Sequence, residues 1–297
     1  MTRHQLAWLF PAALAAVIAA GCKGAPPPTQ DAATQESAPP PVEKNRPVIL
    51  ATTTSTQDTG LLDVLVPLFE KKTGLTVKTI AVGSGQAMAM GKRGDADVLL
   101  VHSPDDEKTF VEEGFGLRRR IVMHNDFVVV GPAEDKAKVK GAASAAEAFE
   151  AIAAAGALFV SRGDDSGTHK KEKKLWGGAG ADPGGKTWYL ETGSGMGQTL
   201  QVASEKGAYT LTDRGTYLAL KGTLHLDILV EGDPGLFNVY HVIEVSPQKL
   251  PLVNADGARA FADFILSPEA QDVIRTFGTE KFGTPLFYSD AGKEESE

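Results

Sequence analysis

Short apolar runs alternate with longer polar and amphipathic segments from Pro47 to the end of the chain. The apolar runs predict buried strands and the segments between them predict helices. Such alternation is typical of an α/β layered fold. The predicted strands cover residues 48–51, 76–82, 97–101, 120–124, 127–130, 157–160, 188–190, 208–211 and 237–245, and the predicted helices cover residues 61–72, 86–93, 105–113, 143–155, 170–175, 196–206, 213–220, 258–266 and 268–277.

The first residues do not share this alternation. An apolar segment, residues 6–20, follows Arg3 and runs through small residues into Cys22, which is the form of a secretory signal. It is shorter than the roughly 20 residues that a membrane-spanning helix needs. Small residues before a lone cysteine resemble the bacterial lipoprotein box, although Ala19 stands where Leu is usual. We therefore expect Cys22 to carry a lipid after removal of residues 1–21; a simple cleaved signal with an incidental cysteine is the alternative.

Two further segments lack the composition of a folded core. Residues 22–46 are rich in Pro, Ala, Gln and Ser, which predicts an extended tether between the anchor and the body. Residues 291–297 predict a disordered tail.

Composition narrows the class of protein. With 42% hydrophobic and 23% charged residues in 297, the chain is globular material for one or two domains. Its formal charge of −8 offers no basic surface for nucleic acid or an anionic membrane. A single cysteine excludes an internal disulfide and a cysteine-based zinc site, and the six histidines lack the spacing of metal ligands. We expect no metal and no cofactor.

Four junctions between a predicted strand and a predicted helix carry hydroxyl side chains and glycines. They are Thr52–Thr56, Gly83–Gly85, Ser161–His169 and Thr192–Gly197. A helix start exposes backbone N–H groups and the positive end of the dipole, so hydroxyls placed there add donors suited to an oxyanion. One such residue alone is usually a helix cap. Four of them, in a fold that binds ligands at the carboxyl ends of its strands, predict one converging site in which Arg162 is the only cation.

These motifs resemble the tungstate-binding receptors of bacterial ABC importers. The most specific strings are Thr52-Thr53-Thr54-Ser55 and the run Arg162 to His169, and the motifs follow the family's order over nearly the whole body. The resemblance implies a two-lobed α/β fold, the type II periplasmic-binding-protein fold, with two hinge crossings and closure on a tetrahedral oxyanion. The extended runs 127–132 and 237–245 are our candidates for the crossings. The lobes would then comprise residues 47–129 with 238–290, and residues 130–237.

The resemblance also implies which residues bind the ligand. They belong to the four loops: Thr53, Thr54, Ser55, Ser84, Arg162, Ser166, Gly167, Thr168 and Ser194. Arg162 would be the main charge partner. Related phosphate receptors have an acid at the position of Asp164, where it can accept the proton of hydrogen phosphate. Because tungstate, molybdate and sulfate carry no proton near neutral pH, we expect Asp164 to orient Arg162 or another donor; a solvated loop acid is the alternative.

The predicted function is therefore that of a non-enzymatic receptor. We expect a lipid-anchored, exported monomer of the cell envelope that captures tungstate and delivers it to an ABC permease, without nucleic acid. Molybdate is the nearest rival ligand, and phosphate and sulfate are others. A secreted phosphate- or sulfate-ester hydrolase is the alternative from another class, because four donor loops also suit a transition state.

Three motifs receive a structural interpretation. Residues 180–187 satisfy the P-loop pattern but follow a basic helix in place of a strand, which indicates a surface loop. The lysines at 170, 171, 173 and 174 indicate a solvated helix face. His169 is expected to be a first-turn histidine at a lobe surface.

Overall fold

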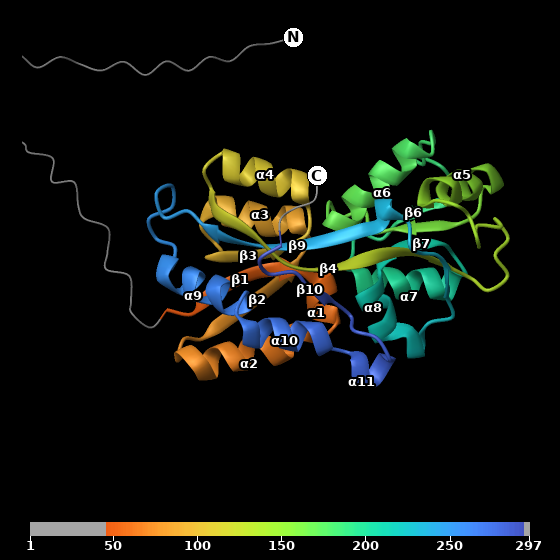
Figure 1. Cartoon of the computed structure of the whole chain (residues 1–297). Coiled ribbons are helices and arrows are strands. Elements are labelled where there is room, and N and C mark those ends of the chain that lie inside the picture. Colours follow the sequence, from red (N-terminus) through yellow and green to blue (C-terminus); the bar gives the residue numbers. More distant parts are fainter. Residues whose placement is uncertain (1–45, 294–297) are drawn as a thin grey trace, which may run out of the picture. The chain divides into compact units, whose positions relative to one another are not determined.

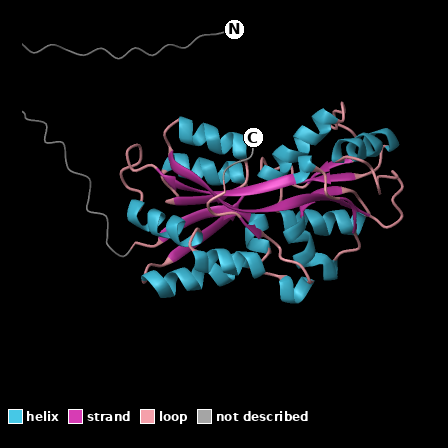
Figure 2. Ribbon diagram, in the orientation of Figure 1, coloured by secondary structure: helices cyan, strands magenta, loops and turns pink. Residues whose placement is uncertain are grey.

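The computed structural model describes residues 46–293, and strands and helices alternate throughout this part of the chain (Figure 1, Figure 2). The predicted signal peptide, Cys22, all of the tether except Arg46, and residues 294–297 lie outside the described residues. None of the described helices is long and apolar enough to span a membrane.

The strands are β1 (Val48–Thr53), β2 (Val77–Val82), β3 (Val98–Val101), β4 (Gly116–Gly131), β5 (Phe159–Ser161), β6 (Tyr189–Glu191), β7 (Thr210–Asp213), β8 (Asp227–Val230), β9 (Phe237–Val245) and β10 (Tyr288–Ser289). The helices are α1 (Thr54–Asp58), α2 (Leu61–Thr73), α3 (Ser84–Arg93), α4 (Pro104–Glu112), α5 (Ala145–Ala155), α6 (Gly167–Gly178), α7 (Met196–Lys206), α8 (Arg214–Leu220), α9 (Ala255–Ile265), α10 (Pro268–Thr276) and α11 (Thr279–Phe282), with 3-10 turns η1 (Lys221–Thr223) and η2 (Pro234–Leu236).

The strands of the first lobe form one sheet in the order β10-β4-β9-β3-β1-β2. Strand β1 pairs in parallel with β2 and β3, whereas β9 runs antiparallel to both β3 and β4. Successive side chains of β1 point to opposite faces, so Leu50 packs beneath α2 and α9 while Ala51 packs beneath α3. Helices therefore cover both faces, and the carboxyl ends of the parallel strands are left for loops.

The second lobe is built on strands β5 to β8 and helices α5 to α8. Strand β5 pairs in parallel with β6 and touches β7 through a bridge between Phe159 and Tyr209. One core, around Phe149 and Trp176, lies beneath α5 and α6, and the other, around Leu200, lies beneath α7 and α8. Each lobe thus has its own hydrophobic interior, and the two meet along a seam (Figure 1).

Two long strands connect the lobes. The first ten or so residues of β4 pair with β9, but from Phe127 to Val130 the strand pairs with β7 instead. The chain returns through η2 into β9, whose Asn238 is paired with Asn125. The runs 120–124 and 127–130 were expected as separate strands and are one strand, because Asn125 and Asp126 continue the ladder with polar side chains. The division into lobes 47–129 with 238–290 and 130–237 remains a proposal.

Several short elements were not expected. Helix α1 contains only Thr, Ser, Gln and Asp, so no apolar periodicity predicts it. Strands β8 and β10 are four and two residues long, and they pair with the carboxyl end and the middle of β4, respectively. Residues 180–187, which match the P-loop pattern, form turns between α6 and β6 with no helix after them. Residues 291–293 of the expected disordered tail are described, and the Ala291 amide donates to Gln271 at 3.1 Å.

Candidate functional site

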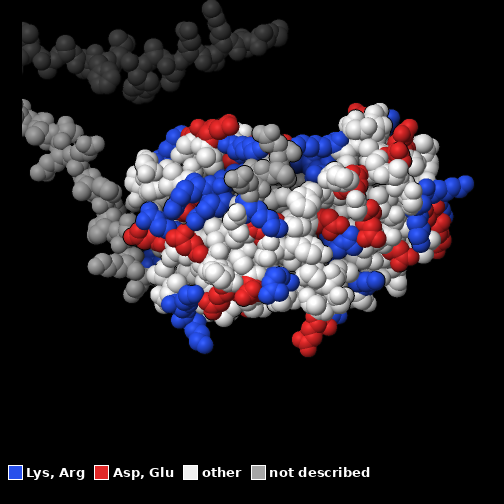
Figure 3. All heavy atoms as spheres, viewed as in Figure 1, with Lys and Arg blue, Asp and Glu red and all other residues white. Residues whose placement is uncertain are grey.

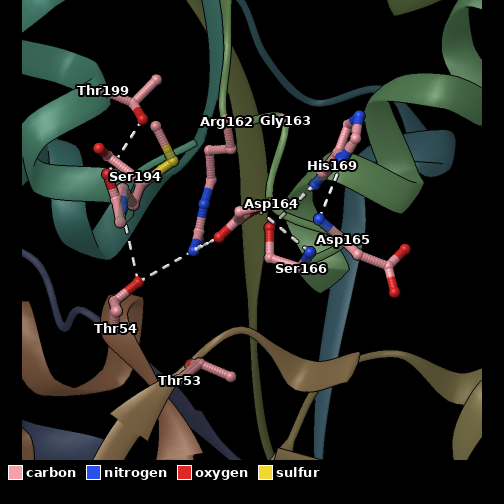
Figure 4. Close-up of polar contacts among 12 residues, drawn as sticks. Thr53, Thr54, Arg162, Gly163, Asp164, Asp165, Ser166, His169, Ser194 and Thr199 are labelled. Atoms are coloured by element: carbon pink, nitrogen blue, oxygen red, sulfur yellow. Dashed lines mark hydrogen bonds and ion pairs between the residues drawn. The ribbon is translucent and has the colours of Figure 1, made fainter. Parts of the chain in front are cut away.

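The four donor loops meet at the seam between the lobes. Two of them begin α1 and α3 in the first lobe, and the other two begin α6 and α7 in the second. The Oγ1 atom of Thr54 accepts hydrogen bonds from Arg162 Nη2 at 3.1 Å and from the Met196 amide at 3.4 Å, which joins three of the loops (Figure 4). Gly83 lies against Ser166, so the loop that begins α3 also contacts this group.

Arg162 is the charged centre of this junction. Its side chain is 1% exposed, and its Nη2 donates to Asp164 Oδ2 at 2.5 Å as well as to Thr54. Its Nε and Nη1 atoms are buried and have no hydrogen-bond partner among the described residues. Because a buried cation with unsatisfied donors is costly, this arrangement favours an anion that supplies the missing acceptors.

Two hydroxyl groups of the described residues are also buried without a hydrogen-bond partner. Ser55 Oγ in α1 and Thr168 Oγ1 in α6 are buried and have no hydrogen-bond partner within the described part of the chain. Each lies in the first turn of its helix, where backbone N–H groups are also exposed. Ser55, Arg162 and Thr168 therefore present open donors from both lobes.

Three other predicted ligand residues act as caps or brace a loop. Thr53 Oγ1 accepts from the Thr56 amide at 3.4 Å, Ser166 Oγ accepts from the His169 amide at 3.2 Å, and Ser84 Oγ accepts from the His102 amide at 3.4 Å. A hydroxyl that accepts an amide hydrogen keeps its own O–H to donate. The cap and ligand interpretations of these residues are thus compatible.

Ser194 and Gly167 contribute differently. Ser194 Oγ donates to the carbonyl of Thr192 at 3.2 Å, so in this rotamer its hydrogen is already used, and its amide donates to Thr192 Oγ1 at 3.3 Å. Gly167 begins α6 and contributes backbone only.

Asp164 faces Arg162. One carboxylate oxygen accepts from the guanidinium, and the other accepts from the Ser166 amide at 3.2 Å. Asp165 and Gly163, on either side, adopt positive φ, which gives the tight turn that brings the carboxylate back onto Arg162 (Figure 4). Asp164 therefore orients the cation and holds the start of α6.

Sequence reasoning missed His102, which follows β3. Its ring is buried, and its Nδ1 lies 3.0 Å from Asn238 Oδ1. Asn238 donates to Asn125 at 2.8 Å, and Asn125 donates to Asp213 at 3.3 Å, so a buried polar chain crosses both connecting strands. Burial, with the nearby charge of Arg162, lowers the pKa of His102 to about 3, which keeps the ring neutral. Asparagines in otherwise apolar strands were the available signal.

One prediction about α6 was wrong, and the other was incomplete, because Lys173 and Lys174 are exposed but the lysine face also contacts the other lobe. His169 is buried, and its Nδ1 accepts from the Asp165 amide at 3.1 Å, so it holds the Arg162 loop and does not face solvent. Lys170 and Lys174 form ion pairs with Asp106 and Asp105 on α4 of the other lobe. That side of α6 bridges the lobes, which local sequence could not reveal.

Comparison with known proteins places this site in a family. The model of the PBP superfamily domain matches residues 27–269. The tungstate-binding protein TupA of Peptoclostridium acidaminophilum is 53% identical over 248 residues, 83% of this chain and 86% of the relative. The chain belongs to the tungstate-binding protein family of the PBP superfamily.

Solved structures of this family show the same fold. The structure described as the tungstate ABC transporter from Geobacter sulfurreducens is 50% identical, with a TM-score of 0.71 over 78% of this chain and 99% of that one. The tungstate-binding protein TupA from Desulfovibrio alaskensis G20 is 49% identical, with a TM-score of 0.69 over 83% of this chain and 100% of that one. The two-lobed periplasmic-binding fold is therefore established. Among the described residues, no cluster of His, Cys, Asp and Glu could hold a metal ion.

Behind the site, Glu172 anchors α6 from within the second lobe. Its Oε1 accepts from Trp176 Nε1 at 3.0 Å and from the Tyr189 hydroxyl at 2.7 Å. Burial raises the pKa of Glu172 to about 7, against an ordinary value of 4.5.

This raised pKa predicts how stability depends on pH. Between pH 4.5 and 7 the unfolded chain ionises Glu172 while the folded protein keeps it protonated, so the free energy of unfolding falls as pH rises through this window. Glu172→Gln removes the loss, and we expect it to be about 2–3 kcal/mol more stable relative to wild type at pH 8 than at pH 4.5. Urea unfolding at both pH values measures this difference. Glu150→Gln, at an exposed position of α5, serves as the control, and an equal pH response in both variants would contradict the assignment.

Proposed function

We propose that this protein is the exported receptor of an ABC importer, that it captures tungstate between its lobes, and that it passes the anion to the membrane permease. The observation that carries the proposal is the buried guanidinium of Arg162, whose Nε and Nη1 have no partner among the described residues, as is also true of the hydroxyls of Ser55 and Thr168 in the first turns of α1 and α6. The names of the relatives support tungstate as the anion.

The state of Asp164 supports an anion without a proton. Both of its carboxylate oxygens are engaged, one by Arg162 and one by the Ser166 amide. These bonds direct the carboxylate toward its own loop, so we propose that it orients Arg162 and does not take the proton of hydrogen phosphate. Tungstate, molybdate and sulfate require only donors, which the loops supply in excess. Molybdate remains the nearest rival because its size and charge are almost those of tungstate.

Binding in an acidic protein is consistent with this mechanism. The chain carries a formal charge of −8, and on the face in Figure 3 acidic and basic side chains are intermixed. Affinity must then come from local donors. Hydrogen bonds to a charged group contribute about 1.5–3 kcal/mol each, so seven aligned donors provide roughly 10–20 kcal/mol. This sum is larger than most values estimated for the free-energy cost of association, about 4–15 kcal/mol.

The site does not favour the hydrolase alternative. A hydrolase of phosphate or sulfate esters needs a base to activate its nucleophile. His102 is neutral, but its pKa of about 3 makes it a poor base. The Nδ1 atom of His169 already accepts from the Asp165 amide. We therefore propose binding without catalysis and without a cofactor.

Outside the described residues, we propose that Cys22 carries a lipid that holds the receptor, as a monomer, at the membrane surface of the cell envelope. The Pro-rich residues 22–46 would form the tether that lets the body reach the permease.

The binding proposal predicts a large effect at Arg162. Arg162→Ala removes the cation and its open donors, and we expect tungstate affinity to fall at least a hundredfold, which corresponds to about 3 kcal/mol. Calorimetric titration with tungstate, molybdate, sulfate and phosphate measures affinity and preference together, and we expect tungstate to bind wild type most tightly.

A matched control is Arg93→Ala, which removes an exposed arginine paired with Asp95 in the first lobe and should bind like wild type. Undiminished binding by Arg162→Ala would contradict the site. Tightest binding of phosphate by wild type would instead contradict the role given to Asp164.

The anchor has its own test. Cys22→Ser removes the only acylation site that the signal provides, so the full chain should move from the membrane fraction to the soluble exported fraction. Cell fractionation and immunoblotting measure this, with Ser37→Ala in the tether as a control that stays at the membrane. Membrane retention of Cys22→Ser would refute the lipid anchor without touching the binding site.

A further inference from the structure

Five glycines at the starts of α3, α6 and α7 face the opposite lobe. Gly83 and Gly195 are helix caps with φ of −76° and −64°, which any residue can adopt. Gly85, Gly167 and Gly197 lie inside the first turns of α3, α6 and α7. None of them is among the glycines with positive φ. Backbone conformation therefore does not require glycine at these positions.

Space across the seam does require it. A Cβ added to Gly85 would lie 2.9 Å from the main-chain oxygen of Asp165, and one added to Gly167 would lie 2.6 Å from the main-chain oxygen of His102. Main-chain atoms inside a packed loop cannot move aside as a flexible side chain can. In both cases the glycine and its neighbour belong to different lobes.

The remaining glycines repeat the arrangement with looser contacts. A Cβ on Gly83 or Gly195 would lie 3.1–3.2 Å from Ser166 or Thr54, and one on Gly197 would lie 3.0 Å from a carboxylate oxygen of Asp58. We call these five residues the seam glycines: Gly83, Gly85, Gly167, Gly195 and Gly197.

We propose that the seam glycines set how closely the two lobes can approach, so that a side chain at Gly85 prevents the closed state in which the anion is enclosed. This inference rests on the proposed function and deepens it. It assigns these glycines to contact between lobes, whereas their sequence pattern alone is explained equally well by close approach to the ligand.

Other contacts across the seam act in the same direction. The Gly197 amide donates to Asp58 Oδ2 at 3.1 Å, and the ion pairs of Lys170 and Lys174 with α4 lie at one rim. All of them connect opposite lobes and need the same close approach. A Cβ that separates the lobes would loosen these contacts together with the anion site.

Helix propensity predicts that a substitution at Gly85 changes stability and ligand affinity in opposite directions. Alanine favours a helix over glycine by up to about 1 kcal/mol, so Gly85→Ala should stabilise α3 in the open protein. The same methyl group collides with Asp165 only when the lobes close. Stability without ligand and affinity for ligand should therefore change in opposite directions, whereas a merely structural defect lowers both.

The test compares Gly85→Ala with wild type in the full chain. We expect an unchanged or raised melting temperature without ligand, a tenfold or greater loss of tungstate affinity by calorimetry, and no decrease in the radius of gyration on adding tungstate by small-angle X-ray scattering. Gly177→Ala is the matched control, because it lies in α6 with no atom within 4 Å of the added Cβ. It should leave both affinity and compaction unchanged.

A second variant grades the effect. Gly197→Ala meets only the movable side chain of Asp58 and Leu220, so its affinity loss should be smaller than that of Gly85→Ala. Wild-type affinity and compaction in Gly85→Ala would overturn the proposal. A lowered melting temperature of Gly85→Ala, together with an equal loss of tungstate affinity in Gly177→Ala, would also overturn it. If wild type does not bind tungstate, the proposed function fails, and the same comparison is made with whichever of molybdate, sulfate or phosphate compacts wild type.

Discussion

The guanidinium of Arg162 is almost completely removed from water, and among the described residues only its Nη2 atom is hydrogen-bonded. Two bonds hold it, one to Asp164 in its own loop and one to Thr54 of the other lobe. The first fixes the direction of the cation, and the second ties it to the seam. A buried cation held in this way but left with open donors is costly unless an anion completes it. The loop turns, the helix starts and the contact between the lobes all fix the position of this guanidinium.

The lobes can meet around this cation because the hinge is continuous with the sheets. Strand β4 changes partner from β9 to β7 without ending, so one continuous strand belongs to the sheets of both lobes. The buried hydrogen-bonded chain from His102 through Asn238 and Asn125 to Asp213 crosses both connecting strands, and His102 Nε2 is its one end without a partner among the described residues. A neutral His102 adds no second cation beside Arg162, so the guanidinium, its Asp164 partner and the helix starts set the field in the site.

Much of this organisation could be predicted from the sequence, and the physical reasons are local. The apolar runs define strands, and Ser, Thr and Gly after them define helix starts, so the meeting of the donor loops at the seam follows from the topology of an α/β fold. The family resemblance supplied the order of the loops and the two-lobed architecture. Asp164 illustrates the limit, since the choice between orienting Arg162 and facing solvent depended on a turn that only the structure resolves.

Most of what could not be predicted depends on the opposite lobe. Lys170 and Lys174 have the pattern of a solvated helix face, but α4 of the other lobe carries the acids that pair with them. His169 has the position of a surface histidine, yet the Asp165 turn folds over it. Gly85 has no strained backbone to explain it, and its reason lies in the 2.9 Å between a Cβ and an Asp165 oxygen. The contacts of Lys170, Lys174 and Gly85 are non-local, so no periodicity or spacing in the chain indicates them, whereas the contact of His169 is local and depends on the positive φ of Asp165.

The central claim is that an anion completes the donors of Arg162, and a crystal grown with tungstate tests it most directly. An anomalous difference map collected at a tungsten absorption edge locates the metal without reference to the protein phases. We expect one dominant peak enclosed at the seam, with the oxygens of the anion within hydrogen-bond distance of Arg162 Nε or Nη1, Ser55 Oγ and Thr168 Oγ1. A dominant peak elsewhere, or a peak at the seam whose oxygens do not contact Arg162, would contradict it.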